Sequence, residues 1–252
     1  MASVPPQSAR RGLPILLVAS LLAGCGAADR ASADRFREGG RLIALSGGDA
    51  GAAGACFTCH GLDGRGNGAG APRLAGMGLG YLDRQLDDYA TGLRRHPEME
   101  AFARRLPPRD RQAVSAFYAA LPVAPGAMPA TPAPSLYTSG DPARGLAACA
   151  DCHGLRGEGV GDGNPPIGAQ PAAYLAAQMH AWRSSARRND AENVMLLISR
   201  RLDAEEIETL AAYAASLPAG PPSPGSPEAS PAARRADPRN GASAQRPHEA
   251  AQ

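Results

Sequence analysis

The sequence predicts an all-α chain with two small tandem domains. Apolar residues recur at helical spacing in several segments, and no segment shows a convincing strand-like alternation of apolar and polar residues. One five-residue motif, Cys-x-x-Cys-His, occurs first at residues 56–60 and again 93 residues later at residues 149–153. Such a repeat indicates a duplicated domain, and 252 residues leave room for two copies.

Residues 1–24 have the layout of a secretory signal. Two arginines precede an apolar run from Leu13 to Leu22, which is too short to span a bilayer comfortably. The run ends in Leu22-Ala23-Gly24-Cys25, which resembles the lipobox of bacterial lipoproteins. This resemblance implies cleavage before Cys25 and acylation of its thiol, so that lipid chains hold the protein on a membrane surface. The alternative is an ordinary signal peptide followed by a chance cysteine.

The first domain is predicted to span residues 30–122, with residues 27–33 as a short tether. Apolar positions at helical spacing predict helices at three places, namely residues 34–45, 81–89 and 108–121. The segment after His60 is too rich in glycine for regular structure. It should wrap closely around a bound group, because a backbone without Cβ can approach such a group.

Cys-x-x-Cys-His is typical of the covalent attachment of a c-type haem. Cysteines three apart lie on one face of a helical turn, so both thiols can reach the two vinyl groups of one porphyrin. The histidine then lies under the iron and supplies a ring nitrogen as proximal ligand. The predicted attachment residues are Cys56, Cys59, Cys149 and Cys152, and the predicted iron ligands are His60 and His153. Two haem groups would also supply the core that small domains with few aromatic residues lack.

Two other interpretations of the cysteines are open. The two pairs could together bind one structural zinc ion, or they could be disulfide or thioredoxin-like redox pairs. Zinc sites rarely keep their pairs so far apart, and neither alternative explains a histidine directly after both pairs. With Cys25 assigned to the lipobox, the five cysteines leave none for a disulfide.

The similarity between the two halves extends well beyond the motif. Residues 56–95 align without gaps on residues 149–188, with 15 of 40 positions identical, and a three-residue insertion then shifts the offset from 93 to 96. At that offset Met99 meets Met195, and no other methionines match each other. A thioether sulfur is the usual partner of histidine in electron-carrying haem proteins, so these two residues are the predicted sixth ligands. The alternative for each is a methionine that fills a gap in the core.

Two prolines lie 12 residues beyond the histidines of the two motifs. A carbonyl near Pro72 or Pro165 could accept the second ring N–H of the histidine and so fix its tautomer and orientation. His96 lies close to Met99 but has no counterpart in the second copy, which predicts a surface residue. Tyrosines and arginines that match between the copies could bind haem propionates, or the arginines could form a solvated face. The matched residues are Tyr81 with Tyr174, Arg94 with Arg187, and Arg95 with Arg188.

A Pro/Ala-rich linker is predicted at residues 123–134, followed by the second domain at residues 135–218. That domain should repeat the helices, at residues 174–182 and 203–217. Residues 219–252 are rich in Pro, Ser, Ala and Arg, which predicts a disordered tail. Once the signal is removed, 24 arginines face 24 acidic residues, and this balance argues against nucleic acid as a partner.

These motifs resemble the dihaem cytochrome c4 group, close to the c553-type class I cytochromes. The resemblance covers about residues 35–218 and is carried by the two Cys-x-x-Cys-His-Gly segments, Pro72-Arg73-Leu74-Ala75-Gly76, Tyr81-Leu82-x-x-Gln85-Leu86 and the two methionine segments. It implies two all-helical class I cytochrome c domains, packed with their haem groups near each other. It also implies a protein that shuttles electrons in the periplasm, often to a terminal oxidase. The second copy departs from the group's usual Leu-Ala-Gly-Gln element, since it reads Pro165-Pro166-Ile167-Gly168-Ala169-Gln170.

The expected function is that of a lipid-anchored dihaem electron carrier in the periplasm, between a respiratory donor and a terminal oxidase or another acceptor. An iron held by histidine on one side and methionine on the other has no open position for a substrate, so we do not expect an enzyme. The alternative is the cytochrome subunit of a dehydrogenase complex, or a dihaem redox enzyme such as a peroxidase or a thiosulfate-oxidising enzyme. A zinc-binding module is a third candidate.

Overall fold

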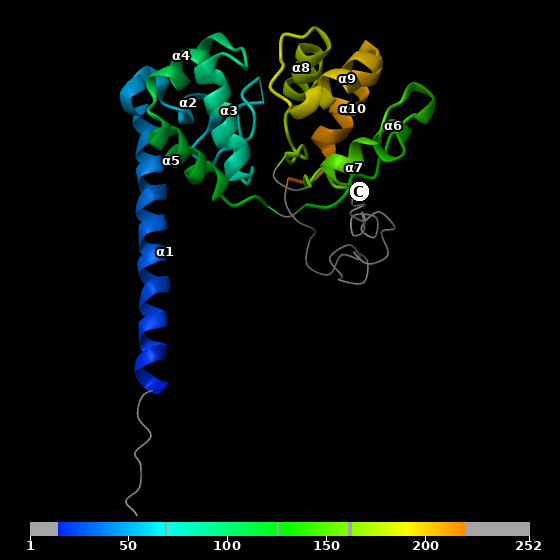
Figure 1. The fold of residues 1–252 in the computed structure, drawn as a ribbon. Coiled ribbons are helices and arrows are strands. Elements are labelled where there is room, and N and C mark those ends of the chain that lie inside the picture. The colour runs from blue at the N-terminus through cyan, green and yellow to red at the C-terminus, as the bar shows by residue number, and fades with distance from the viewer. Residues whose placement is uncertain (1–14, 69, 125, 161–162, 220–252) are drawn as a thin grey trace, which may run out of the picture.

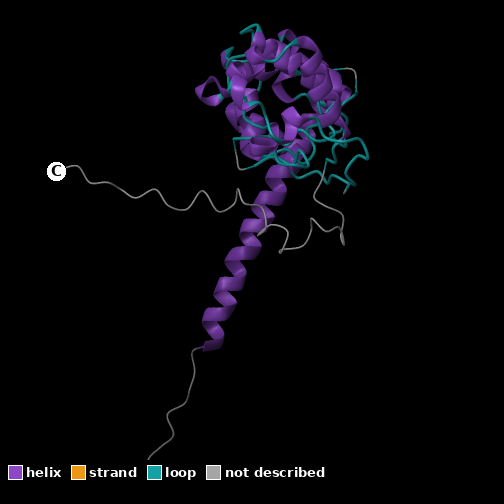
Figure 2. Cartoon of the chain, turned by 90° about the vertical axis from the view of Figure 1, so that its right-hand side faces the viewer, coloured by secondary structure: helices purple, strands orange, loops and turns teal. Residues whose placement is uncertain are grey.

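The computed structural model describes residues 15–219 except residues 69, 125 and 161–162, with side chains from residue 30 onward. Within these residues every regular element is an α-helix or a 3₁₀-helix, apart from two isolated β-bridges. The predicted all-α class is therefore confirmed. Two helical domains lie side by side (Figure 1), and one long helix projects from the first of them, as both views show (Figures 1 and 2).

The helices of the first domain are α1 (Ile15–Ser46), η1 (Gly48–Ala50), η2 (Ala52–Gly54), α2 (Phe57–His60), α3 (Leu79–Thr91), α4 (Pro97–Arg105) and α5 (Pro108–Ala119). α1 and α3 contain the helices predicted at residues 34–45 and 81–89, and α5 begins as predicted at residue 108 but ends two residues earlier than predicted, at Ala119. Residues 27–33, predicted as a tether, are helical because α1 runs through them without a break. α4 was not predicted, although Pro97 at its start, Glu98 in its first turn and Arg105 in its last are all helix signals.

The C-terminal part of α1 packs along α5 and closes the core of the first domain. Gly40 faces α5 so closely that a Cβ at this position would overlap the backbone carbonyl of Ala113. The two helix backbones can approach each other because residue 40 has no side chain. The core beneath them is formed by Ala44, Met77, Leu82, Val114 and Tyr118.

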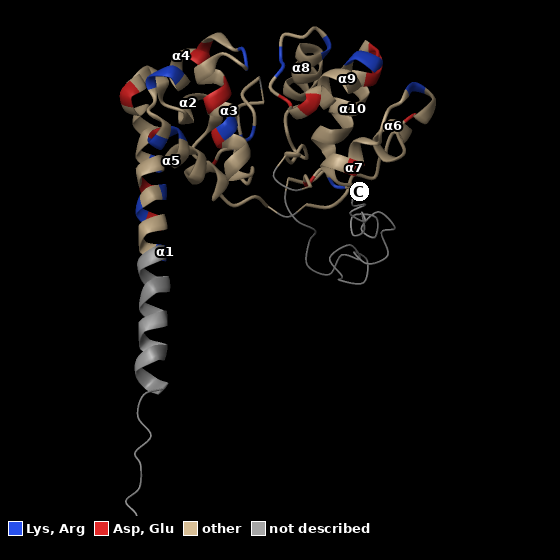
Figure 3. Cartoon of the chain, in the orientation of Figure 1, with Lys and Arg blue, Asp and Glu red and all other residues tan. Residues whose placement is uncertain are grey.

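Charged residues of both signs follow one another on α1, before and beside its contact with α5 (Figure 3). Arg37 pairs with Asp34, and Arg41 lies 2.8 Å from Glu38, so each pair joins neighbouring turns of one helix face. No helix in the described part of the chain has the length and the apolar run needed to cross a membrane. The predicted signal, residues 1–24, and the side chain of Cys25 lie outside the described side chains.

The second domain repeats the arrangement, with the short α6 in place of the long α1. Its helices are α6 (Ser135–Thr138), η3 (Pro142–Arg144), α7 (Cys149–His153), α8 (Ala172–Arg183), η4 (Ala191–Asn193), α9 (Val194–Arg201) and α10 (Ala204–Ser216). α8 contains the helix predicted at residues 174–182, and α10 corresponds to the one predicted at residues 203–217. A capping box starts α10, in which the carboxylates of Asp203 and Glu206 each accept the other residue's backbone N–H.

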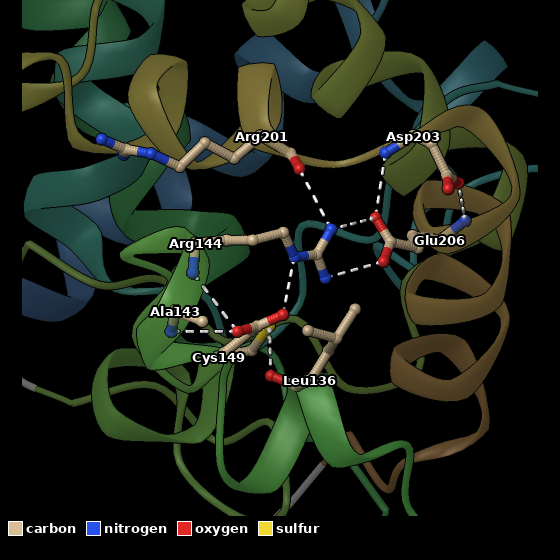
Figure 4. A network of polar contacts seen from close by, with 8 residues as sticks. Leu136, Ala143, Arg144, Cys149, Arg201, Asp203 and Glu206 are labelled. Carbon is tan, nitrogen blue, oxygen red and sulfur yellow. Dashed lines mark hydrogen bonds and ion pairs between the residues drawn. The ribbon is translucent and has the colours of Figure 1, made fainter.

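A polar network ties the segment before the second motif to the start of α10 (Figure 4). Nε of Arg144 donates to Asp141 at 2.7 Å, Nη2 donates to Glu206 at 2.8 Å, and Nη1 donates to the carbonyl of Arg201 at 3.3 Å. Partly exposed ion pairs contribute little stability individually, but three acceptors on one guanidinium restrict its geometry. The residue 93 positions before Arg144 is Gly51, which has no side chain to form such a network in the first domain.

The described residues of the predicted linker, residues 123–134, form no helix and run between the two domains (Figure 1). The carbonyl of Gly126 accepts a hydrogen bond from Arg156 at 2.8 Å, which holds the linker against the second domain. The tail predicted to be disordered, residues 219–252, lies outside the described residues apart from Ala219.

The two domains also contact each other directly through buried polar groups. The side-chain amide of Gln170 pairs with the backbone of Arg73, since its oxygen accepts from the backbone N–H at 2.9 Å and its nitrogen donates to the carbonyl at 2.8 Å. The same nitrogen lies 3.5 Å from the sulfur of Met77. Met77 and Gln170 are aligned positions of the repeat, so the contact joins equivalent places in the two domains.

The close packing of α1 on α5 predicts opposite effects for two neighbouring glycines. Gly40→Ala should lower the free energy of unfolding by about 1 to 3 kcal/mol, because the added methyl group forces the two helices apart. Gly39→Ala should raise it by up to about 1 kcal/mol, since nothing lies within 4 Å of the added methyl and alanine favours a helix. Denaturant unfolding followed by circular dichroism measures both. Equal effects of the two changes would contradict the assigned packing.

Candidate haem sites

Each motif lies on a short helix that directs both cysteines and the histidine from a single turn. The first is carried by α2, which begins after Cys56, and the second by α7. All four thiols are unpaired, as covalent attachment to a haem requires. Burial raises the pKa of Cys56 and of Cys149 to about 11, so both thiols are protonated at neutral pH. In the described residues, no three side chains of His, Cys, Asp or Glu come together as a metal site.

Both histidines present one ring nitrogen to a proline carbonyl. Nδ1 of His60 lies 3.0 Å from the carbonyl oxygen of Pro72, and Nδ1 of His153 lies 2.9 Å from that of Pro165. A carbonyl oxygen can only accept, so Nδ1 carries the proton and Nε2 keeps the lone pair that a metal needs. Burial lowers the pKa of both imidazoles, which favours the neutral, ligating form.

A glycine allows each proline loop to cross over the histidine. Gly66 has a φ of 77° and donates its N–H to the carbonyl of His60 at 2.9 Å. A Cβ at this position would overlap the carbonyl of Ala71, in the residue before Pro72. Gly159 has a φ of 80° and the corresponding bond to His153, at 2.8 Å. The glycine-rich segments therefore bring the proline carbonyls to the histidines.

The two aligned methionines lie at equivalent places, on the short helix that precedes the last helix of each domain. Met99 is on α4 and Met195 is on α9, and both side chains are half-buried. His96 is exposed, as the sequence predicts, and its ring caps α4 by accepting the N–H of Met99 at 3.4 Å.

Two arginines bridge the domains, because each donates hydrogen bonds to a glutamine of its own domain and to the aligned glutamine of the other. Arg94 donates to Gln85 of its own domain at 2.9 Å and to Gln178 of the other domain at 2.7 Å. Arg187 donates to Gln178 at 2.7 Å and to Gln85 at 3.0 Å. Both guanidinium groups are buried, so the prediction of a solvated face is wrong for this pair. It holds for the neighbouring Arg95 and Arg188, which are exposed.

These buried guanidinium groups have neutral hydrogen-bond partners. Besides the glutamines, Arg94 donates to the hydroxyl of Tyr174 at 2.9 Å, and Arg187 donates to the amide oxygen of Asn189 at 2.8 Å. The buried carboxylate of Asp88 binds Asn189 and not an arginine. Buried charge is costly without an opposite charge, so the pair fits a site that receives carboxylates. The thiols and the free Nε2 atoms of the two motifs fit a covalently attached haem.

The family model for cytochrome c matches residues 47–121 and residues 143–218. These two stretches contain both haem motifs and make up more than half of the chain. The chain belongs to the cytochrome c family. Two cytochrome c domains, each with its Cys-x-x-Cys-His motif, make this cytochrome a carrier of two covalently bound haem c groups.

The relatives of this cytochrome bear two names. It is 40% identical over 185 residues to a thiosulfate dehydrogenase electron acceptor from Stutzerimonas stutzeri, which covers 71% of this chain and 86% of the relative. It is 33% identical over 184 residues to cytochrome c4 from Pseudomonas aeruginosa, which covers 69% of this chain and 92% of the relative. The predicted membership of the dihaem cytochrome c4 group is confirmed, and the function is that of an electron carrier, not an enzyme.

Solved structures give the same two likenesses. The thiosulfate dehydrogenase TsdBA from Marichromatium purpuratum matches with a TM-score of 0.65 and 42% identity, over 77% of this cytochrome but only 44% of that chain. Cytochrome c4 from Pseudomonas stutzeri matches with a TM-score of 0.59 and 29% identity, over 68% of this cytochrome and 98% of that chain. This cytochrome therefore spans less than half of the M. purpuratum chain and nearly the whole of the cytochrome c4.

The exchange of partners between the arginines predicts a role in holding the domains together. In the haem-containing protein, Arg94→Gln should destabilise the contact by about 1.5 to 3 kcal/mol for each charged hydrogen bond lost. The linker should then be cut faster by protease, and the thermal unfolding midpoint should fall. Arg95→Gln is the matched control, because that side chain is 69% exposed and touches only Glu100 at 3.6 Å. A linker equally resistant in both variants would contradict the bridging role.

Proposed function

We propose that this cytochrome accepts electrons from a thiosulfate dehydrogenase outside the cytoplasm and passes them to a further redox partner. The observation that carries the proposal is its 40% and 35% identity to two proteins named thiosulfate dehydrogenase electron acceptor, from Stutzerimonas stutzeri and Thiomonas intermedia. Both identities exceed the 33% identity to cytochrome c4 from Pseudomonas aeruginosa. Of the two functions expected from the sequence, this favours the dehydrogenase-linked one over the carrier between a respiratory donor and a terminal oxidase.

The proposed ligation suits a carrier. His60 and Met99 would hold the iron of the first domain, and His153 and Met195 that of the second. The free Nε2 of each histidine and the equivalent, half-buried positions of the methionines support this set. Each bound haem supplies a one-electron couple, and a thioether ligand raises its potential, which favours the acceptance of electrons. No coordination position is then left for a substrate.

The proposed location is the periplasm, with the protein held on a membrane surface by lipid at Cys25. Support comes from the signal layout of residues 1–24 and from the lipobox-like sequence that ends at Cys25. Acyl chains at this residue would attach directly to α1, the helix that packs into the first domain. The anchor would thus hold the domains close to membrane-bound redox partners.

A reduction assay tests the proposed donor. Oxidised cytochrome mixed with thiosulfate should stay oxidised, and it should become reduced when a thiosulfate dehydrogenase is added, as followed by the absorption of ferrous haem. A dithionite titration of the same sample counts the haem groups that can be reduced. If the dehydrogenase reduces an artificial acceptor but leaves this cytochrome oxidised, the proposed partnership is wrong.

Substitution of the methionines tests the ligation separately. Met99→Ala and Met195→Ala should each lower the reduction potential of one haem and allow carbon monoxide to bind there, because a ligand position is opened. Met179→Ala is the control, since this half-buried methionine packs against the hydrophobic core of the second domain and has no methionine counterpart in the repeat. Stoichiometric carbon monoxide binding by the unchanged protein would rule out methionine ligation of that haem.

A further inference from the structure

Each domain contains a buried tyrosine that donates a hydrogen bond to the residue after its haem histidine. The hydroxyl of Tyr118 lies 3.2 Å from the carbonyl oxygen of Gly61, and that of Tyr137 lies 2.8 Å from the carbonyl oxygen of Gly154. Gly61 and Gly154 are aligned, and both have nearly the same backbone angles, with φ of 75° and 78° and ψ of 156° and 157°. The accepting carbonyl is therefore equivalent in the two domains.

The two tyrosines themselves are not equivalent in the repeat. Tyr118 lies on α5, behind the motif in the chain, and the aligned residue of α10 is Ala214. Tyr137 lies on α6, ahead of the motif, and the residue 93 positions before it is Ala44, on α1. Both alanines are buried. Each domain thus has one tyrosine and one alanine at these two positions, in opposite order.

The rings nevertheless take the same place in the two cores. Tyr118 packs edge-on against Phe117, with ring centres 5.0 Å apart and planes at 61°. Tyr137 packs edge-on against Tyr213, at 4.9 Å and 67°. Phe117 and Tyr213 are aligned residues. A ring that enters from a different helix therefore meets the same neighbour and the same carbonyl.

The carboxylate beside each of these two glycines also comes from a different position of the repeat. In the first domain Asp63 lies beside Gly61, and in the second Glu158 lies beside Gly154. Asp63 aligns with Arg156, and Glu158 aligns with Arg65, so acid and base are interchanged. Burial raises the pKa of each tyrosine, and the first motif cysteine, Cys56 or Cys149, and this carboxylate raise it further.

Both domains contain the hydrogen bond from a tyrosine hydroxyl to this glycine carbonyl, although the two tyrosines are not aligned residues. Simple inheritance from a duplicated domain would place the tyrosine at one aligned position in both copies. Here the hydroxyl reaches the carbonyl from two unrelated positions, so the place of the hydroxyl is what both domains have in common. Burial raises the pKa of both phenols, which therefore keep their protons and act as donors throughout the neutral range.

We infer that Tyr118 and Tyr137 are positioning residues that hold the backbone directly after the iron-binding histidine and thereby tune the reduction potential of the haem in their own domain. Both glycines have positive φ, and because a glycine backbone is free to adopt many conformations, a hydrogen bond to its carbonyl restricts it. Their carbonyls also accept a backbone N–H, from Gly64 at 3.3 Å and from Gly157 at 3.2 Å. The shorter contact to each carbonyl comes from the tyrosine.

The experiment removes one hydroxyl at a time from the haem-containing protein. Tyr118→Phe and Tyr137→Phe keep the ring but withdraw a donor from the carbonyl, so the surroundings of that motif become more negative and the oxidised iron is favoured. Each variant should lower the potential of one haem and leave the other unchanged, as measured by spectroelectrochemical titration. Tyr213→Phe is the control and should change neither potential, because phenylalanine already stands at the aligned position, residue 117.

A variant that moves the tyrosine of the first domain to another helix tests whether the hydrogen bond matters or the sequence position of the residue. Tyr118→Ala should lower the potential of the first haem, and adding Ala44→Tyr, which copies the second domain, should restore it. If the relocated protein does not fold, the two phenylalanine variants decide. Unchanged potentials in both phenylalanine variants, together with lower thermal unfolding midpoints, would reduce the tyrosines to core packing and overturn the inference. The inference rests on the proposed ligation by His60 and His153, which the absorption spectrum of the unchanged protein tests independently.

Discussion

The hydrogen bond from a histidine Nδ1 to a proline carbonyl is the constraint on which each domain depends. It requires the chain to return over the motif after 12 residues, and this return needs a glycine where the two backbones cross. The same bond sets the tautomer, so that the free ring nitrogen is the one available to a metal. The helices around it enclose the motif and hold the methionine-bearing helix on the same domain.

Duplication explains the polar character of the contact between the domains. Equivalent residues meet across it, so Arg94 and Arg187 bind the same partners. The two like charges are accommodated by sharing the amide oxygens of Gln85 and Gln178. The buried carboxylate of Asp88 joins the same network through Asn189, which accepts from Arg187.

Carrier function follows from the cofactors, whereas the choice of partner does not. Relatives named cytochrome c4 and relatives named thiosulfate dehydrogenase electron acceptor share both haem domains with this chain. The motifs that hold the haem groups therefore do not distinguish the two kinds of partner. The distinction must lie in surface side chains, which electron-transfer proteins use for brief and weakly packed encounters.

The sequence by itself determined what depends on short-range spacing: the helical class, the thiols and histidine of each motif, and the prolines 12 residues beyond. It missed α4, α6 and α9, because a short helix shows little periodicity, and it left the roles of Arg94 and Arg187 undecided. The tertiary structure alone decided which arginines are buried and which tyrosine reaches each glycine carbonyl. The physical reason is that these contacts join distant helices. Tyr118 and Tyr137 serve the same carbonyl from positions that an alignment of the repeat does not pair.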